Sequence, residues 1–360
     1  MAISHKPDLE RKQRLLFYGE LPPNSIHGIA ISNQINIKML ESWFMVDIIE
    51  EKNKLLEHNK ISINKLANVL KNNLIIQVKS IHHKYDYFYL IYSLSTFGSL
   101  KTLTAIIIFR FFNRGKVVLH LHRGDFFSRY YQKKINRFLT KLIFRLSHNI
   151  IVLSENQKSE FETFFKRPFL VLFNTVESEY ETTVAKKQNS RFIYISNYLI
   201  DKGIIDLLEV FRKLTNKYPK IALRTYGAFS DKDLKDTILK YESANINING
   251  PITGIDKFKE LANSDCLILP SWNEGQPMIL LEAMSVGTPI ISTRVGIIPE
   301  LLGVDYPYLS IARDRNTLEN SIVNYINEAN PERISESLKS RFTLFYSHKM
   351  HARNLQNIFR

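Results

Sequence analysis

Residues 271–289 read Ser-Trp-Asn-Glu-Gly-Gln-Pro-Met-Ile-Leu-Leu-Glu-Ala-Met-Ser-Val-Gly-Thr-Pro, and this stretch decides the fold. It carries two carboxylates eight positions apart, Glu274 and Glu282. The apolar run before it, residues 266–270, is typical of a buried strand, and residues 276–286 are predicted to form a helix with Pro277 in its first turn. A strand that leads into a helix N-terminus offers free N–H groups and the positive end of the helix dipole, which favour phosphate oxygens.

The two carboxylates are expected to bind hydroxyls rather than phosphate. Glu282 lies one to two turns inside the helix, where its neighbours are apolar, so it should be largely buried and should need a partner. Eight helical positions span at most roughly 12 Å at about 1.5 Å per residue. One carboxylate can therefore reach a sugar and the other a ribose, with a diphosphate between them. The alternative for two glutamates at this spacing is a pair of solvated surface groups.

These residues resemble the Glu-x7-Glu motif of retaining family 4 glycosyltransferases, which have the GT-B fold. The resemblance extends over most of the chain, because further matches follow in the family's order at residues 201–203, 226–227, 250–252, 265–271 and 287–300. It implies an α/β protein of the GT-B class, with two Rossmann-like parallel-sheet domains that face a central cleft.

Short apolar runs alternate with helical patterns along the chain, which independently favours parallel sheets. The expected strands are residues 14–18, 87–92, 116–120, 149–153 and 169–173, then 191–196, 221–225, 246–248, 266–269 and 289–292. The polar stretch 176–190 has the composition of a linker. We predict an N-terminal Rossmann-like acceptor-side domain at 1–176 and a C-terminal nucleotide-sugar-binding domain at 177–345, and the resemblance implies that a helix within 346–360 returns to the first domain.

The donor phosphates are expected to meet Lys202, which follows a predicted strand and precedes a helix. In the family this lysine neutralises the diphosphate together with an arginine five residues earlier, but Asn197 stands there in this chain. Arg294 and Arg123 are the candidates for the missing cation. The motif loop is expected to contribute Gly275, Gln276, Pro277 and Met278. Gly28 should allow close approach of a phosphate after the first strand, although His27 replaces the glycine that the family usually has before it.

The segment 116–125 contains two histidines at strand spacing, His120 and His122, followed by Asp125. Taken alone, this pattern also suits a metal. The resemblance implies instead that the donor is held without a metal or other cofactor, and that His122 contacts the sugar and the acceptor side. His120 is expected to be structural. Asp125 is expected to orient His122 or to face the acceptor, with Arg123 beside it.

Composition and charge narrow the location and the partners. The only cysteine, Cys266, lies in an apolar run, so no internal disulfide can form, and no signal peptide or membrane-spanning segment is expected.

The net charge is +14, and residues 101–150 hold 11 Lys and Arg against one acidic residue, interleaved with aromatic side chains. This region is either a solvated face over a core or a contact for an anionic membrane surface. A nucleic-acid recognition module is missing, so nucleic acid is not an expected partner. We expect a cytoplasmic protein that is peripheral on the inner face of the cytoplasmic membrane.

The resemblance implies a retaining glycosyltransferase that moves a sugar from a nucleotide-diphospho-sugar to a lipid-linked or cell-surface polysaccharide acceptor. Lys202 and the helix N-terminus would stabilise the leaving diphosphate, Glu274 would hold sugar hydroxyls, and Glu282 would bind the ribose. Two alternatives remain. One is a sugar-nucleotide epimerase with the GT-B fold, and the other is a non-catalytic module that binds a membrane or an anionic polymer.

Overall fold

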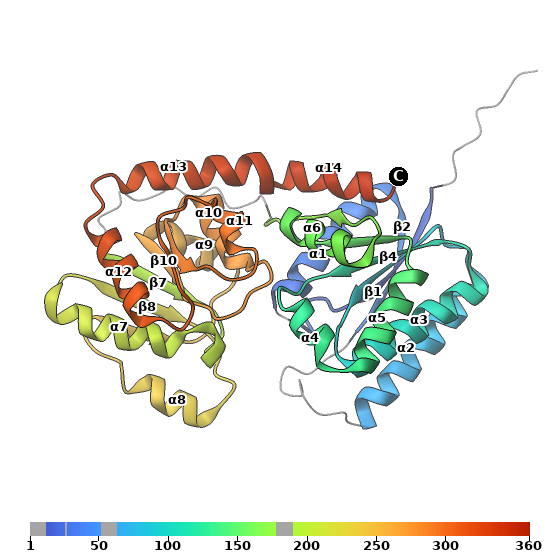
Figure 1. Ribbon diagram of the computed structural model, residues 1–360, viewed down its shortest axis with the longest axis horizontal. Helices are drawn as coiled ribbons and strands as arrows, with labels where there is room; N and C mark the ends of the chain where they lie inside the picture. Colours follow the sequence, from blue (N-terminus) through green and yellow to red (C-terminus); the bar gives the residue numbers. More distant parts are fainter. Residues whose placement is uncertain (1–11, 26, 52–62, 178–189) are drawn as a thin grey trace, which may run out of the picture. The chain divides into compact units, whose positions relative to one another are not determined.

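The computed structural model describes residues 12–25, 27–51, 63–177 and 190–360 (Figure 1). The chain divides into two compact units. Unit 1 comprises Met1–Leu121, Arg129–Ile151 and Ile358–Arg360, and unit 2 comprises His122–Ser128 and Val152–Asn357. The boundary predicted near residue 177 adjoins residues 178–189, which lie outside the described part, so the predicted domain limits stay predictions.

The first half of the chain alternates strands and helices. Its elements are β1 (Arg14–Gly19), α1 (Gly28–Trp43), β2 (Met45–Glu50), α2 (Ile63–His82), β3 (Tyr87–Tyr92), α3 (Thr96–Phe112), β4 (Lys116–Leu121), α4 (Phe126–Gln132), α5 (Lys134–Leu146), β5 (Asn149–Val152), α6 (Glu155–Phe165) and β6 (Leu170–Val171). The sheet order is β2-β1-β3-β4-β5-β6, and the first five strands pair in parallel.

The second half repeats this architecture. Its elements are β7 (Arg191–Ile195), a 3-10 turn η1 (Ile200–Lys202), α7 (Ile204–Lys217), β8 (Ala222–Tyr226), α8 (Lys232–Leu239), β9 (Ile246–Asn249), α9 (Gly254–Asn263), β10 (Cys266–Leu269), α10 (Met278–Val286), β11 (Ile290–Thr293), α11 (Ile298–Leu302), β12 (Leu309–Ser310), α12 (Arg315–Ile326), α13 (Pro331–Arg341), a π-helical turn η2 (Phe342–Tyr346) and α14 (His348–Ile358). The parallel strands are ordered β12-β11-β10-β7-β8-β9.

The second sheet has the strand order of a Rossmann fold. When β7 is counted as its first strand, the order is 3-2-1-4-5-6 read from β9 to β12. The order reverses between β7 and β10, and open parallel sheets bind ligands beyond the carboxyl ends of the strands at such a switch point. A binding site in unit 2 is therefore expected at the loops that follow β7 and β10.

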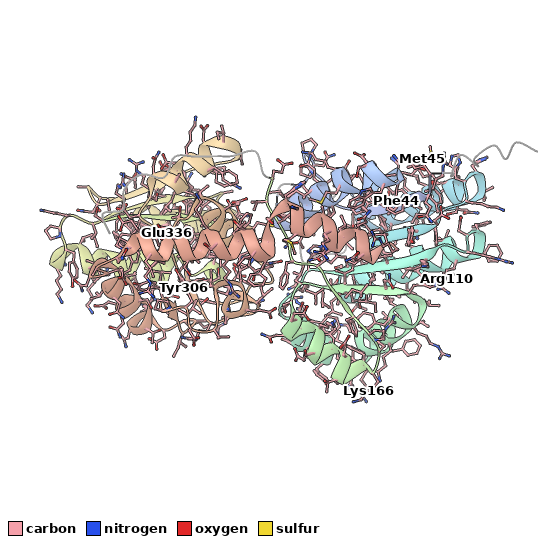
Figure 2. The ribbon with its side chains drawn as sticks, turned by 90° about the horizontal axis from the view of Figure 1, so that it is seen from above. Phe44, Met45, Arg110, Lys166, Tyr306 and Glu336 are labelled. Atoms are coloured by element: carbon pink, nitrogen blue, oxygen red, sulfur yellow. The ribbon has the colours of Figure 1, made fainter. Side chains whose placement is uncertain are left out.

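The predicted strands match the observed ones wherever both faces of the sheet are covered. In β10 all four residues are buried, as they are in the centre of β1, and such strands are continuous apolar runs. No comparable apolar run marks β2, an edge strand that contains Asp47 and exposes Met45 (Figure 2). The two-residue strand β12 was missed for the same reason, because it is a short edge strand.

The predicted start of the motif helix was wrong. The motif helix α10 begins at Met278, two residues later than expected, and Pro277 is its N-cap with an extended ψ of 118°. A residue before proline is disfavoured in the helical region, so Gln276 cannot extend the helix backwards. In the first half of the chain, the helices α4 and α5 are separated by Lys133, which has an extended conformation.

The last residues of the chain pack into the core of unit 1. The Phe359 carbonyl accepts a hydrogen bond of 2.7 Å from the hydroxyl of Tyr87, and its ring contacts the rings of Phe44, Tyr87 and Tyr89. Phe44 is labelled in Figure 2. In unit 2, the hydroxyl of Tyr306 donates to the carbonyl of Ile290 at 2.8 Å, which ties the segment before β12 to β11.

Candidate active site

Lys202 and Glu274 meet at the switch point of the second sheet. Lys202 ends the turn that follows β7, and Glu274 lies in the loop that follows β10. The lysine Nζ is 2.7 Å from the glutamate Oε1, although 72 positions separate the two residues along the chain. The hydroxyl of Ser271 donates to the same Oε1 at 2.7 Å. The sequence predicted both residues as site groups, and the structure brings them into direct contact.

Backbone contacts fix the two loops against each other. The N–H of Trp272 donates to the carbonyl of Asp201 at 2.8 Å, so the loop after β10 is bonded to the turn that carries Lys202. Gly203 has φ +71°, and a Cβ on it would lie 2.1 Å from the carbonyl oxygen of Pro270. Only glycine fits this approach without a shift, which holds the Lys202 ammonium close to the Glu274 carboxylate.

The backbone of the Glu274 loop is enclosed by two glycines of unit 2. A Cβ on Gly124 would lie 2.0 Å from the Glu274 carbonyl oxygen, and a Cβ on Gly296 would lie 2.1 Å from the same atom. A Cβ on Gly275 would in turn lie 2.5 Å from the carbonyl oxygen of His122. The loop that carries His122 therefore abuts the Glu274 loop. Glycine at these positions therefore fixes the position of the loop backbone from which the Glu274 side chain extends.

The N-terminus of α10 faces the same loop. No side chain caps it, and Met278 is its first residue. The Oε1 of Gln276 accepts a hydrogen bond of 2.6 Å from the backbone N–H of Asn174. Its Nε2 is buried, and among the described residues it has no hydrogen-bond partner. A buried amide donor without a protein partner beside an uncapped helix N-terminus suits an oxygen-rich anionic ligand.

Glu282 is buried in α10 and pairs with Lys257 of α9. The Nζ of Lys257 is 2.6 Å from the Oε1 of Glu282, and both side chains are largely buried. Sequence reasoning required a partner for Glu282 but missed this lysine. Lys257 lies in an ordinary amphipathic helix with Lys259 two positions on, so no local pattern distinguishes the two lysines.

The remaining predicted residues of unit 2 interact with separate partners. Arg123 and Asp125 bind each other through two hydrogen bonds of 2.6 and 2.7 Å, so the guanidinium proposed as a second cation already has a carboxylate partner. His122 is buried at the start of this segment, whereas Asn197 and Arg294 are exposed. Arg294 has its backbone N–H bonded to the carbonyl of Ser310 at 2.9 Å.

Gly28 belongs to unit 1, where it is the first residue of α1. His27 is the N-cap of this helix, and its Nδ1 accepts from the N–H of Ala30 at 3.4 Å while its Nε2 pairs with Glu20. The residue that replaces the family's glycine thus caps the helix that Gly28 opens. His120, also in unit 1, is buried, with Nδ1 2.7 Å from the hydroxyl of Tyr89.

Within the described ranges, no group of three or more His, Cys, Asp or Glu side chains is arranged to hold a metal ion. No helix in the same part of the chain is long and apolar enough to cross a bilayer.

The fold is the GT-B fold of glycosyltransferases. Sucrose-phosphate synthase from Thermosynechococcus elongatus superimposes with a TM-score of 0.78 at 15% identity, covering 97% of this chain and 98% of that one. The catalytic domain of starch synthase IV from Arabidopsis thaliana, bound to ADP and acarbose, gives a TM-score of 0.70 at 10% identity and covers 96% and 98%. Identities this low establish the fold alone, and they confirm the predicted fold class.

Residues 176–338 match the family described as glycosyl transferases group 1. An uncharacterized glycosyltransferase of Methanocaldococcus jannaschii is 27% identical over 229 residues, which cover 56% of each chain. This chain thus aligns with little more than half of that relative's length. The matched residues 176–338 include Lys202, Glu274 and Glu282. The predicted recognition is confirmed at this level, and the assignment to family 4 stays a prediction.

Proposed function

We propose that this protein is a retaining glycosyltransferase that moves a sugar from a nucleotide-diphospho-sugar to a glycan or lipid-linked acceptor. The observation that carries the proposal is the contact of 2.7 Å between Lys202 and Glu274 at the carboxyl ends of β7 and β10. A cation for phosphate and an acceptor for sugar hydroxyls stand side by side at the strand-order switch of a Rossmann sheet. The solved starch synthase structure, which contains ADP and acarbose, supports this class of donor and acceptor.

Lys202 and the N-terminus of α10 would hold the diphosphate. The ammonium is paired with Glu274 in this structure, so an incoming diphosphate competes for it and receives a cation that is already fixed in position. The α10 N–H groups and the Nε2 of Gln276 add donors without charge. These groups would stabilise the negative charge that grows on the leaving diphosphate as the bond to the sugar breaks.

Glu274 would bind the sugar through its second oxygen. Its Oε1 accepts from Ser271 and Lys202, and the described residues make no hydrogen bond to Oε2. The same division holds for Glu282, whose Oε1 is bonded to Lys257. Oε2 of Glu282 would accept from the ribose hydroxyls. Each carboxylate thus keeps one oxygen on a protein partner for orientation and one for a ligand hydroxyl.

Retention would proceed without an enzymic nucleophile. The bond between the anomeric carbon and the diphosphate oxygen breaks, the acceptor oxygen bonds to the same face of that carbon, and the departing diphosphate takes the acceptor's proton. No protein carboxylate is required on the opposite face. His122, whose backbone abuts Gly275, would contact the sugar and the acceptor side, with Arg123 and Asp125 on the same segment.

A panel of UDP-, GDP- and ADP-sugars tests the proposal, with nucleotide release measured with and without a glycan or lipid extract. We expect release from one donor that rises with acceptor, and a product whose anomeric configuration by NMR matches the donor. Conversion of the donor without any acceptor would favour the epimerase. Binding of nucleotide with no turnover of any donor would favour a non-catalytic module, and an inverted product would refute retention.

A further inference from the structure

The outer face of α2 is apolar, which is unusual for a surface helix. It exposes Leu66, Leu70, Leu74, Val78 and Ile81, each with 47% to 62% of its surface accessible. At 3.6 residues per turn, these positions fall within a sector of about 120° along the length of the helix. An ordinary surface helix turns such a stripe toward the core and its polar residues toward water.

The inner face of α2 is largely polar, with Ile76 as its fully buried apolar residue. Asn72 and Ser80 are buried beside it, and the Ser80 carbonyl accepts from the Asn113 side-chain amide at 2.8 Å. Lys79 pairs inward with Asp47 of β2 at 2.9 Å. The helix is therefore held in this orientation by specific polar contacts on its inner side, and the apolar stripe is left outside.

The stripe continues over the neighbouring helices of unit 1. Figure 1 shows α2, α3 and α5 as a layer of adjacent helices, in agreement with their packing contacts. On α3 the exposed large apolar residues are Leu100, Ile107, Phe111 and Phe112, and on α5 they are Ile135 and Phe138. The apolar outer face thus spans three helices and exceeds the scattered exposed residues of a soluble surface.

The charge of α2, α3 and α5 indicates the kind of surface that these helices bind. The sequences of α2, α3 and α5 contain nine Lys and Arg and no Asp or Glu. Lys79 and Lys101 pair inward with Asp47 and Glu51. Of the other seven, Lys71, Lys134 and Arg110 are among those that are exposed, and Arg110 is labelled in Figure 2. Two copies of such a face would bring positive charge against positive charge, so self-association is disfavoured. An anionic surface is favoured.

We propose that the outer face of α2, α3 and α5 docks on an anionic lipid bilayer, with the stripe of α2 inserted at the level of the headgroups. A helix with an apolar face flanked by Lys and Arg lies in the plane of the interface. Each basic side chain near an anionic surface adds attraction that salt weakens. The basic region 101–150 suggested membrane contact from composition, and the structure adds α2, which lies outside that region and supplies the apolar stripe.

Vesicle binding tests the docking surface, and it is independent of the proposed sugar transfer. The full chain is sedimented with vesicles of phosphatidylcholine alone or with phosphatidylglycerol at roughly 30%, at low and high salt. We expect binding to the anionic vesicles only, and weaker binding at high salt. Failure to bind anionic vesicles at low salt would overturn the proposal, as would equal binding to neutral ones.

The double variant Leu70→Gln/Leu74→Gln isolates the apolar stripe. Both side chains are at least 60% exposed, so the fold should be retained. We expect vesicle affinity to fall at least about tenfold, with nucleotide release from soluble acceptors unchanged. The matched control is Val304→Gln/Leu344→Gln, which removes two exposed apolar side chains of unit 2 and should bind vesicles as the parent does. Equal binding by all three proteins would overturn the role of α2.

A fluorescent label reports insertion directly. Cys266 is buried and is the only cysteine, so Leu70→Cys can be labelled selectively with a polarity-sensitive dye. Emission should shift to the blue when anionic vesicles are added, whereas a label on Val304→Cys should not respond. If sedimentation equilibrium instead shows a dimer that Leu70→Gln/Leu74→Gln dissociates, and vesicles cause no shift, the face is a contact between copies and the proposal is wrong.

Discussion

Lys257 and Glu282 form a buried ion pair that joins α9 to α10, with Nζ 2.6 Å from Oε1. Glu282 lies just over one turn into the motif helix, which begins at Met278. The geometry of the pair keeps the carboxylate in one orientation through one oxygen. A cation on a neighbouring helix, absent from the motif itself, therefore positions the motif's second glutamate.

Lys257→Met should weaken donor binding without slowing the chemical step. Glu282 would lose its partner, so we expect KM for the donor to rise about tenfold with kcat changed less than twofold, as for the loss of a ground-state contact. The unfolding free energy should fall by about 3–5 kcal/mol, because removal of one partner leaves a buried charge. Steady-state kinetics and urea unfolding measure both effects.

Lys259→Met is the control for this variant. Lys259 lies on the same helix, and its side chain is 60% exposed beside Asp256. Neither KM nor stability should change by more than a small amount, since exposed ion pairs contribute about 0–1 kcal/mol. The double variant Lys257→Met/Glu282→Gln should recover part of the stability lost by Lys257→Met, and additive losses would contradict a direct pair.

Lys202→Met should lower kcat about 100-fold, the scale seen when one stabilising group for developing charge is removed. Glu274→Gln should cause a comparable loss, since the amide cannot accept through both oxygens. Because the two side chains touch, their double variant should lose less than the product of the single losses. Lys213→Met, in an exposed pair with Glu319, is the control. Full nucleotide release by both single variants would remove these residues from the mechanism.

Gly296→Ala should displace the Glu274 loop. Its Cβ would lie 2.1 Å from the Glu274 carbonyl, and φ is +53° there, so the change combines a clash with backbone strain. We expect a loss of stability of about 1–3 kcal/mol and a fall in kcat/KM of about 100-fold, because small displacements of a catalytic group are costly. Gly250→Ala is the control, with no atom within 4 Å of its Cβ. Equal activity of the two variants would show that the position of the Glu274 loop does not affect catalysis.

The strands and the site differ in how far the sequence predicts them. Buried parallel strands are continuous apolar runs, so β3 and β10 are found with their observed limits, whereas the edge strand β2 is interrupted by Asp47 and is missed. Local patterns also placed Lys202 and Glu274 after strands. Their contact at 2.7 Å depends on β7 and β10 being neighbours in the sheet. Local sequence patterns do not predict the order of strands in a sheet.

Residues that act from a different element could not be predicted in this way. Lys257, and not Lys259, pairs with Glu282 because of the angle at which α9 packs on α10. That angle is a property of the tertiary structure. The same holds for α2. Its leucines at four-residue spacing predict a helix, and periodicity assigns that face to the core. Only the inward contacts of Asn72, Lys79 and Ser80 reveal that the face is outside.

His351 should make stability depend on pH between about 4 and 6.5. It is buried in α14, and its Nδ1–H donates to the carbonyl of Phe173 at 2.6 Å. Burial lowers its pKa to about 4 from the ordinary 6.5, against the opposing effect of this hydrogen bond. The unfolded chain therefore binds more protons than the folded one in this window, so stability is complete above pH 6.5 and is lost as pH falls toward 4.

The loss should reach about 2 kcal/mol by pH 5 and approach about 3 kcal/mol at pH 4, at about 1.4 kcal/mol per pKa unit. Urea unfolding of the parent and of His351→Asn at pH 7 and pH 5 measures it. The variant is expected to be less stable at pH 7, because it loses packing, but to lose less stability on acidification. His82→Asn is the control, since His82 is exposed at the end of α2 and is not among the groups that shift the pKa of His351, so the parent's pH dependence should stay in place. If His351→Asn loses as much stability between pH 7 and pH 5 as the parent does, the acid sensitivity arises from other groups and His351 is already protonated in the folded chain.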